Sequence, residues 1–259
     1  MAPSDTARPP LDPRLFGDGP ARDPRFTVRE VWAELENYPD GTPERDHEFL
    51  HRQMNEEMCV MENAARSLAD FPDADWSVRK GLARQCADEA RHTMNYHRLL
   101  LARGGHVGQY PVTNFQYRIL GRIDNLLGRL AVQNRSFEAD GLDAATHALA
   151  EARAKGDEVL AETYDAQQAD EVCHIRFAND YIKAQLQQSP RVGLQIARAL
   201  NLCAEAFAQV FAGGGEDVEK YGVAVEARLE AGFSPEEVEV AVRQSNERRA
   251  AVRARLGLT

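Results

Sequence analysis

The chain has 259 residues, of which 43% are hydrophobic and 28% are charged, and its formal net charge at pH 7 is −10. This composition is typical of a globular protein and excludes collagen-like and disordered chains. Phosphate backbones bind clusters of lysine and arginine, so an acidic chain disfavours a nucleic-acid partner. Its uninterrupted apolar runs are only a few residues long, which excludes a membrane-spanning helix of roughly 20 residues.

Residues 1–25 are rich in proline, aspartate and arginine and lack the apolar core of a secretory signal. We therefore expect a disordered N-terminal arm and a cytoplasmic protein. The four cysteines have no CxxC spacing, which predicts reduced thiols rather than a disulfide framework or a zinc ribbon.

Apolar residues at helical spacing dominate the rest of the chain, and alternation typical of strands is nearly absent, so we predict an all-α fold without a sheet. Turn residues separate the expected helices. These cover residues 27–37, 44–71, 76–103, 114–154, 157–188, 191–212, 216–231 and 235–256. The four longest predict an elongated bundle within residues 26–188. Residues 189–259 are expected to form a helical extension that packs on the bundle or on a partner subunit, so a homodimer stays open.

Two Asp-Glu-x-x-His motifs, residues 88–92 and 170–174, lie in the second and fourth long helices. Residues three apart share one face of a helix, so the Glu and the His of each motif can bind one metal ion. In both helices this pair falls on the apolar stripe that should face the interior. A carboxylate and an imidazole buried without partners would cost several kcal/mol, so a metal ion is the simplest compensation.

Helix geometry adds two more glutamates at the same height. Glu57 lies 14 residues before Phe71, and Glu89 lies 14 residues after Asp75, so the two are level. In the second pair of long predicted helices, 114–154 and 157–188, the heights of Glu138 and Glu171 along the helix axes differ by only about 3 Å. The predicted metal ligands are Glu57, Glu89, His92, Glu138, Glu171 and His174.

This arrangement resembles the ferritin-like di-iron and di-manganese carboxylate proteins, in which two helices each supply one Glu and two others each supply Glu-x-x-His. The resemblance covers about residues 44–188. Residues 135–143, together with residues 88–92, also resemble a bacterial ferritin-like family of unassigned function. The resemblance implies a ferritin-like four-helix bundle with additional N- and C-terminal helices. It also implies that Asp88 and Asp170 accept hydrogen bonds from metal-bound histidines, as in bacterial di-iron monooxygenases.

Oxygen and nitrogen donors without a thiolate favour iron or manganese. We expect two Fe ions, with Mn/Fe as the alternative, O₂ as co-substrate, and an external electron donor such as a reductase or ferredoxin. The expected function is that of an oxidoreductase, a di-iron monooxygenase or oxidase that hydroxylates, N-oxygenates or desaturates a small organic substrate. The alternatives are a ferroxidase, iron-handling or peroxide-removing protein, and a tRNA-modifying hydroxylase, which the acidic charge disfavours.

Side chains within about a turn of the ligands are the candidates for a substrate pocket: Gln85, Cys86, Tyr96, Arg135, Phe137, Tyr164 and Gln167. Three of them have an alternative structural role, since Arg135 could pair with an internal acid, and Cys86 and Tyr96 could simply pack. The other histidines, at positions 47, 51, 97, 106 and 147, are expected at the surface.

Overall fold

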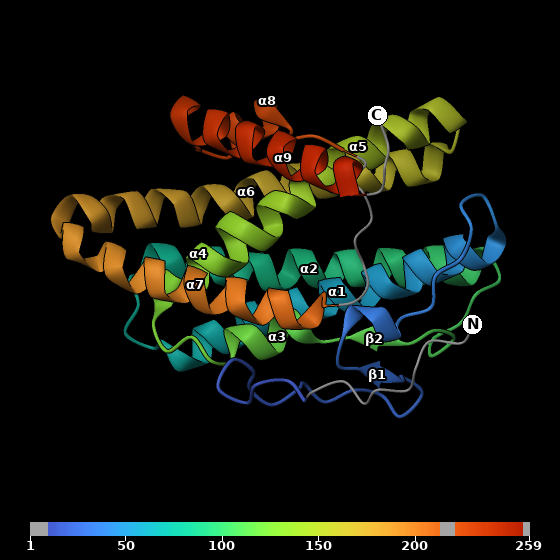
Figure 1. The fold of residues 1–259 in the computed structure, drawn as a ribbon, viewed down its shortest axis with the longest axis horizontal. Helices are drawn as coiled ribbons and strands as arrows, with labels where there is room; N and C mark the ends of the chain where they lie inside the picture. Colours follow the sequence, from blue (N-terminus) through green and yellow to red (C-terminus); the bar gives the residue numbers. More distant parts are fainter. Residues whose placement is uncertain (1–9, 213–220, 256–259) are drawn as a thin grey trace.

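The structure is a computed structural model, and it describes residues 10–212 and 221–255. Four helices, called the long helices below, form two packed pairs: α1 (Pro43–Asp70), α2 (Trp76–Ala102), α5 (Glu138–Lys155) and α6 (Glu158–Gln188). Helices α1 and α2 pack as one hairpin, α5 and α6 as a second, and α2 contacts α6 across them (Figure 1). The described residues are mostly helical, which confirms the all-α prediction.

Local signals explain where these helices begin and end. The Thr42 side chain accepts a hydrogen bond from the backbone of Arg45, and Pro43 occupies the first turn of α1. Asp157 caps α6 in the same way, through the backbone of Leu160. Gly156 adopts the left-handed conformation (φ 71°) that ends α5. The last two residues, Gly156 and Asp157, form the turn that joins α5 to α6 in the second hairpin.

Two apolar clusters flank the middle of the long helices. One contains Leu50, Tyr96 and Leu100 and packs against the C-terminal half of α5. The other contains Leu82, Leu130 and Ile182 and lies toward the opposite end. The sequence positions between the two clusters include all the predicted metal ligands, so the candidate site is enclosed along the helix axes.

The predicted helix over residues 114–154 is wrong as a single element. It is divided into α3 (Phe115–Leu120), α4 (Leu126–Val132), a π-helical turn (Gln133–Phe137) and α5. The break has a local cause, because α3 ends at Gly121 and Asn125 starts α4 by accepting a hydrogen bond from the backbone of Gly128. A π-helical turn often marks a functional site, and this one directly precedes Glu138.

The expectations for the N-terminal region also need correction. Residues 27–37 form no continuous helix, but a short strand β1 (Val28–Arg29) and a 3₁₀ turn (Trp32–Glu34). Strand β1 pairs in parallel with β2 (Val112–Thr113), Val28 opposite Val112, so the prediction of no sheet misses this two-residue ladder. The expected disordered arm is wrong for residues 10–25, because Leu15 and Phe16 are buried against α3 and α7; residues 1–9 lie outside the described residues.

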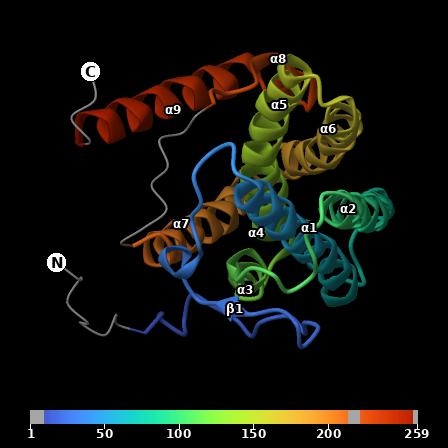
Figure 2. The same ribbon diagram turned by 90° about the vertical axis from the view of Figure 1, so that its right-hand side faces the viewer.

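The C-terminal helices pack on different parts of the fold. After a 3₁₀ turn (Pro190–Val192), α7 (Gly193–Val210) lies against α4, and α8 (Val225–Glu230) contacts α5 and α6 (Figure 2). Arg228 of α8 is buried and binds Asp143 of α5 at 2.6 Å. The last helix, α9 (Pro235–Arg255), contacts α8. Of the helix predicted at 216–231, the described part is helical only over Val225–Glu230, and residues 216–220 lie outside the described residues.

None of the helices in the described ranges is both long and apolar enough to cross a membrane.

Candidate metal centre

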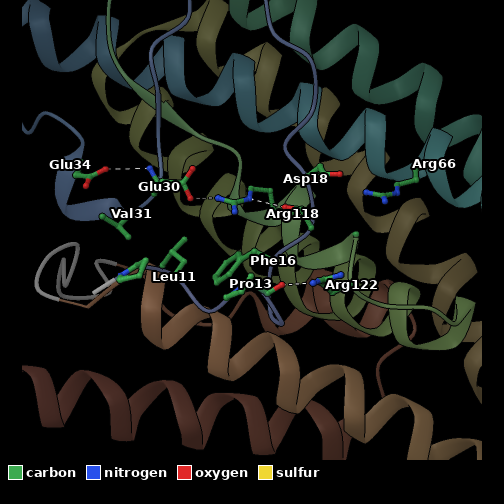
Figure 3. A pocket seen from close by; sticks show the side chains of 13 residues that line it. Leu11, Pro13, Phe16, Asp18, Glu30, Val31, Glu34, Arg66, Arg118 and Arg122 are labelled. Atoms are coloured by element: carbon green, nitrogen blue, oxygen red, sulfur yellow. Dashed lines mark hydrogen bonds and ion pairs between the residues drawn. The ribbon is translucent and has the colours of Figure 1, made fainter. Parts of the chain in front are cut away.

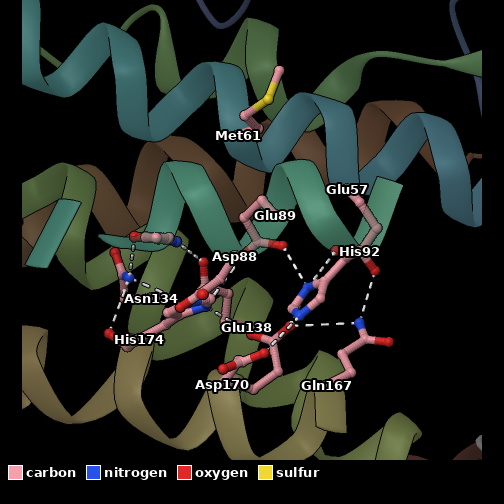
Figure 4. Close-up of polar contacts among 12 residues, drawn as sticks. Glu57, Met61, Asp88, Glu89, His92, Asn134, Glu138, Gln167, Asp170 and His174 are labelled. Atoms are coloured by element: carbon pink, nitrogen blue, oxygen red, sulfur yellow. Dashed lines mark hydrogen bonds and ion pairs between the residues drawn. The ribbon is translucent and has the colours of Figure 1, made fainter. Parts of the chain in front are cut away.

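The long helices bring the six predicted ligands together in the interior, and all of them except Glu171 are labelled in Figure 4. Glu57 comes from α1, Glu89 and His92 from α2, and Glu138 is the first residue of α5. Helix α6 supplies Glu171 and His174. Every one of these side chains is buried, and none is more than 6% exposed. Four carboxylates and two imidazoles are thus removed from water at one point.

Their donor atoms form two overlapping groups, each of which could hold a metal ion. Glu57, Glu89, His92 and Glu171 form the first, and Glu89, Glu138, Glu171 and His174 form the second, with the ligand atoms of each group within 4.8 Å of one another. Glu89 and Glu171 belong to both. A carboxylate has two oxygen atoms, so these two side chains can each serve both ion positions.

The two histidines are held by the aspartate of the opposite motif. Nε2 of His92 lies 3.2 Å from Asp170, and Nε2 of His174 lies 3.1 Å from Asp88. The other ring nitrogen faces the glutamates, with Nδ1 of His92 at 2.9 Å and Nδ1 of His174 at 3.2 Å from Glu89. An acceptor on the remote nitrogen fixes the tautomer in which the inner nitrogen is free to bind a metal.

Arg91 connects the two aspartates on the outer side of this arrangement. Its guanidinium lies 2.9 Å from Asp88 and 2.5 Å from Asp170, which joins α2 to α6 directly above the histidines. The hydrogen bond from His174, with the nearby Arg91, holds the pKa of Asp88 well below its usual range despite its partial burial. Both contacts therefore keep this carboxylate ionised and able to accept from the imidazole.

Without a cation, burial and neighbouring charges shift the pKa values of the buried glutamates and histidines. Burial and the charge of Glu171 raise the pKa of Glu89 to about 7, and the same two causes raise the pKa of Glu138 well above its usual value. Burial disfavours the imidazolium form of His92, but hydrogen bonds to Glu57 and Glu89 outweigh it and raise its pKa to about 11. Raised pKa values at Glu89, Glu138 and His92 mean that these groups favour bound protons, which carry the positive charge that metal cations would otherwise supply.

Two buried atoms support a cation directly. Nδ1 of His174 and Oε2 of Glu171 are buried and make no well-formed hydrogen bond among the described residues, although they lie 3.5 Å from each other and Nδ1 lies 3.2 Å from Glu89. Buried polar atoms are nearly always hydrogen-bonded, so two such atoms facing the centre of an acidic cluster fit a bound metal.

Carboxamides orient the glutamates that belong to only one group. Gln85 and Asn134 donate to Glu138, the latter at 3.2 Å, and Gln133 adds a longer contact at 3.4 Å. Glu57 accepts from Gln167 at 2.8 Å. Gln133 and Asn134 were not predicted: Asn134 stands four residues before Glu138, a spacing that could have found it, but Gln133 reaches Glu138 only through the π-helical turn.

A cavity of about 860 Å³ opens between α1 and α5 and reaches the glutamates Glu57, Glu89, Glu138 and Glu171. Four of the predicted pocket residues line it: Tyr96, Phe137, Tyr164 and Gln167.

The other three predicted pocket residues do not line this cavity. Gln85 reaches Glu138 from behind it, and the thiol of Cys86 lies 3.7 Å from the backbone oxygen of Met61. Arg135 points outward instead, where it pairs with Glu237 of α9 and stacks over Phe233. Arg135 therefore has a structural role, but its acidic partner stands on α9 and not among the acids around the predicted ligands.

One histidine expected at the surface is buried. His51 is fully enclosed, accepts a hydrogen bond from the backbone of Gly108 at 2.8 Å and contacts the rings of Phe26 and Tyr110. Burial, with a smaller effect of His106, lowers the pKa of His51 to about 4. The connection after α2 covers this side chain, and that long-range packing leaves no mark on the helical pattern around residue 51.

A second cavity of about 740 Å³ is lined by the N-terminal segment and by residues in and after α3, and none of the predicted metal ligands lines it (Figure 3). Its three arginines are already engaged: Arg118 with Glu30, Arg122 with the backbone oxygen of Pro13, and Arg66 over the ring of Tyr117. The first two contacts attach the N-terminal segment to α3 and the residue stretch after it, and the third joins α1 to α3, so this cavity has a structural explanation.

A family model described as "Protein of unknown function (DUF455)" matches residues 5–239, and the chain belongs to this family. Comparisons with curated proteins and with solved structures found no match. The family description names no activity, so the chemistry of the site has to indicate the function.

Proposed function

We propose that this member of the DUF455 family is a non-haem di-iron oxidoreductase, with a ferritin-like four-helix bundle, that uses O₂ to oxidise an organic substrate. The observation that carries the proposal is the pair of overlapping donor groups that share Glu89 and Glu171. Because each group contains three carboxylates and one imidazole, the site suits two like ions side by side.

The donor chemistry favours iron among the divalent metals. Glu57, Glu89, His92 and Glu171 would hold one ion, and Glu89, Glu138, Glu171 and His174 the other. Four carboxylates carry a formal charge of about −4, which two divalent cations neutralise. Mixed carboxylate and imidazole ligands without thiolates suit iron, or a manganese–iron pair. When bound, two adjacent Fe(II) ions supply the electrons that O₂ chemistry needs and that side chains cannot provide.

The protein's own residues position these ligands. Asp88 and Asp170 fix the histidine rings through their Nε2 atoms, and the carboxamides fix Glu138 and Glu57. The phenol of Tyr96 donates to Gln167 at 2.7 Å, which turns the amide nitrogen of Gln167 toward Glu57. The apolar clusters on either side exclude bulk water along the helices. Regeneration of Fe(II) would require an external electron donor such as a reductase or ferredoxin.

The cavity between α1 and α5 favours an organic substrate over iron as the molecule acted upon. It extends the site from the glutamates to the surface and is lined by aromatic side chains as well as charged ones. A ferroxidase needs only a path for ions, whereas ligand pockets combine apolar walls with a few polar groups. Iron handling is therefore the alternative that an experiment has to exclude.

The proposal is tested by loading purified protein with Fe(II) under argon, adding O₂, and following both O₂ uptake and the oxidation state of the bound iron. We expect bound Fe(II) to be oxidised in the wild type and not in Glu89→Ala, which removes a ligand from both groups.

Excess Fe(II) separates the alternatives. An oxygenase stops after its two bound ions are oxidised, unless reductant and substrate are supplied. Repeated oxidation of many Fe(II) ions per chain would contradict the proposal and indicate a ferroxidase.

A further inference from the structure

We propose that the cavity between α1 and α5 binds an elongated molecule with an apolar chain and a cationic amino head, with the chain directed toward the glutamates. As an assignment of the substrate class, this inference rests on the proposed function. The binding of such a molecule does not, and it can be measured on the metal-free protein.

The length of the cavity comes from a face of α5 that carries very small side chains. Gly141, Ala144 and Ala148 line the cavity, and a Cβ atom added to Gly141 would meet nothing within 4 Å. The lining continues from Glu138 to Lys155, a span of 17 residues or about 25 Å of helix. Its volume of about 860 Å³ is near the upper end for small-molecule sites, so it accommodates a long ligand.

The end of the cavity nearest Glu138 is aromatic. The rings of Trp32 and Phe211 are stacked at 5.1 Å, and Phe115 meets Phe137 edge-on at 6.4 Å. All four line the cavity. These four rings favour an apolar chain, because they offer it a large area of ring surface beside the polar side chains of Gln116, Gln133 and Glu138.

The opposite end is charged, and every lining cation there has an acidic partner. Arg45 lies 2.7 Å from Glu48, Arg103 pairs with Asp157, and Lys155 lies 3.8 Å from Glu151. Further inside, the guanidinium of Arg52 lies 2.8 Å from Glu48 and 3.3 Å from Glu56. None of these four cations is therefore available to bind a carboxylate or a phosphate.

The lining acids exceed the lining cations even when the four glutamates of the metal centre are set aside. The acids are Asp40, Asp46, Glu56, Asp140, Glu151 and Asp157, and the cations are Arg45, Arg52, Arg103 and Lys155. These acids are ion-paired as well, Asp140 with Arg228 outside the lining, so the surplus is a net charge of the wall and not a set of unpaired carboxylates. A surplus of negative charge attracts an ammonium group and repels an anion. The aromatic wall and the net negative charge of the lining together favour a long-chain amine over a fatty acid or a phosphorylated molecule.

Trp32 supplies a direct probe of binding. The chain has two tryptophans, and the other, Trp76, is 72% exposed at the start of α2. In a Trp76→Phe background the fluorescence reports only on the cavity wall. Metal-free and Mn(II)-loaded protein would each be titrated with dodecylamine, dodecanol and dodecanoate, each below its micelle concentration. The loaded form is included because the four glutamates of the metal-free form can themselves attract the ammonium group. We expect a saturable change with dodecylamine and at least about tenfold weaker binding of dodecanoate.

Matched variants of α5 locate the response. Ala144→Phe and Ala148→Phe place a ring in the cavity, whereas Ala150→Phe adds the same ring at an exposed position of the same helix that does not line it. Both cavity variants should lose the dodecylamine response and keep the wild-type circular dichroism and metal stoichiometry; Ala150→Phe should keep all three.

Equal or tighter binding of dodecanoate, or an unchanged dodecylamine response in both folded cavity variants, would overturn the inference. The two proposals fail separately. Two bound metal ions without amine binding would remove only the substrate class. Amine binding without any metal would remove only the di-iron function.

Discussion

Single-carboxylate variants should separate the two ion positions, because the glutamates do not contribute equally. Glu57 belongs to one donor group, whereas Glu89 belongs to both. Replacing Glu57 with alanine therefore removes a ligand from one ion, and replacing Glu89 with alanine removes a ligand from both.

The expected gain in folding stability from bound metal follows from the linkage between binding and folding. At a free metal concentration of about 100 times Kd, each bound ion stabilises the folded state by about 2.7 kcal/mol. The wild type should therefore gain about 5 kcal/mol from two ions, Glu57→Ala about half of that, and Glu89→Ala almost nothing. For a chain of this size, each kcal/mol corresponds to about 2–4 °C in Tm.

The assay is thermal unfolding by circular dichroism with and without Mn(II), which binds similar donors without reacting with O₂ on this timescale. Comparing each variant with its own metal-free form removes the effect of deleting a buried charge. Glu162→Ala, an exposed change on α6, is the control and should keep the full gain. A full gain in Glu89→Ala, or equal losses in Glu57→Ala and Glu89→Ala, would refute the division into two groups.

Three further predictions concern the surroundings of the site and the buried charges. Asp170→Ala should weaken metal binding about 10–100-fold, because the aspartate orients His92; isothermal titration with Mn(II) measures this, and the exposed Asp180→Ala should change nothing. The pKa of His51 falls from 6.5 to about 4 on folding, so the stability it contributes above pH 6.5 is lost as the pH drops toward 4. The folded state loses up to about 3 kcal/mol of unfolding free energy in this way. Urea unfolding should therefore show a smaller fall in unfolding free energy between pH 7 and pH 4 in His51→Gln than in the wild type, and equal falls would exclude His51 as the cause. The folded-state pKa of Glu89 is raised from 4.5 to about 7, so its contribution, present below pH 4.5, disappears as the pH rises through 7. Metal-free Glu89→Gln should accordingly be more stable than the metal-free wild type at pH 8, by about 1–3 kcal/mol, and an equally stable or weaker variant would contradict the electrostatic reasoning.

The sequence predicted the placement of the six candidate ligands because that placement depends on regular helix geometry. Glu89 and His92 share a face through their spacing, and the caps at Thr42 and Asp157 keep the long helices regular. Glu57 could be chosen over Glu56 because it falls on the inward face of α1, and over Glu62 because its height along α1 matches that of Glu89. Whether these residues bind metal stays a prediction.

The parts that could not be predicted depend on contacts distant in sequence. The π-helical turn brings Gln133 to Glu138, and no periodicity marks it. Residues 10–25 read as an arm because their composition is polar, yet Phe16 is buried in the groove between α3 and α7. Arg135 lies beside a predicted ligand, but the pairing with Glu237 that directs it outward is set by α9. Local pattern fixes the helices here, and tertiary packing fixes what the irregular segments do.

The central claim is that one chain binds two metal ions in this cluster. The most direct measurement is an anaerobic titration of metal-free protein with Fe(II), followed to its end point and checked by elemental analysis after gel filtration. We predict saturation at two ions per chain. Saturation at zero or one, or uptake that continues far beyond two, would contradict the account.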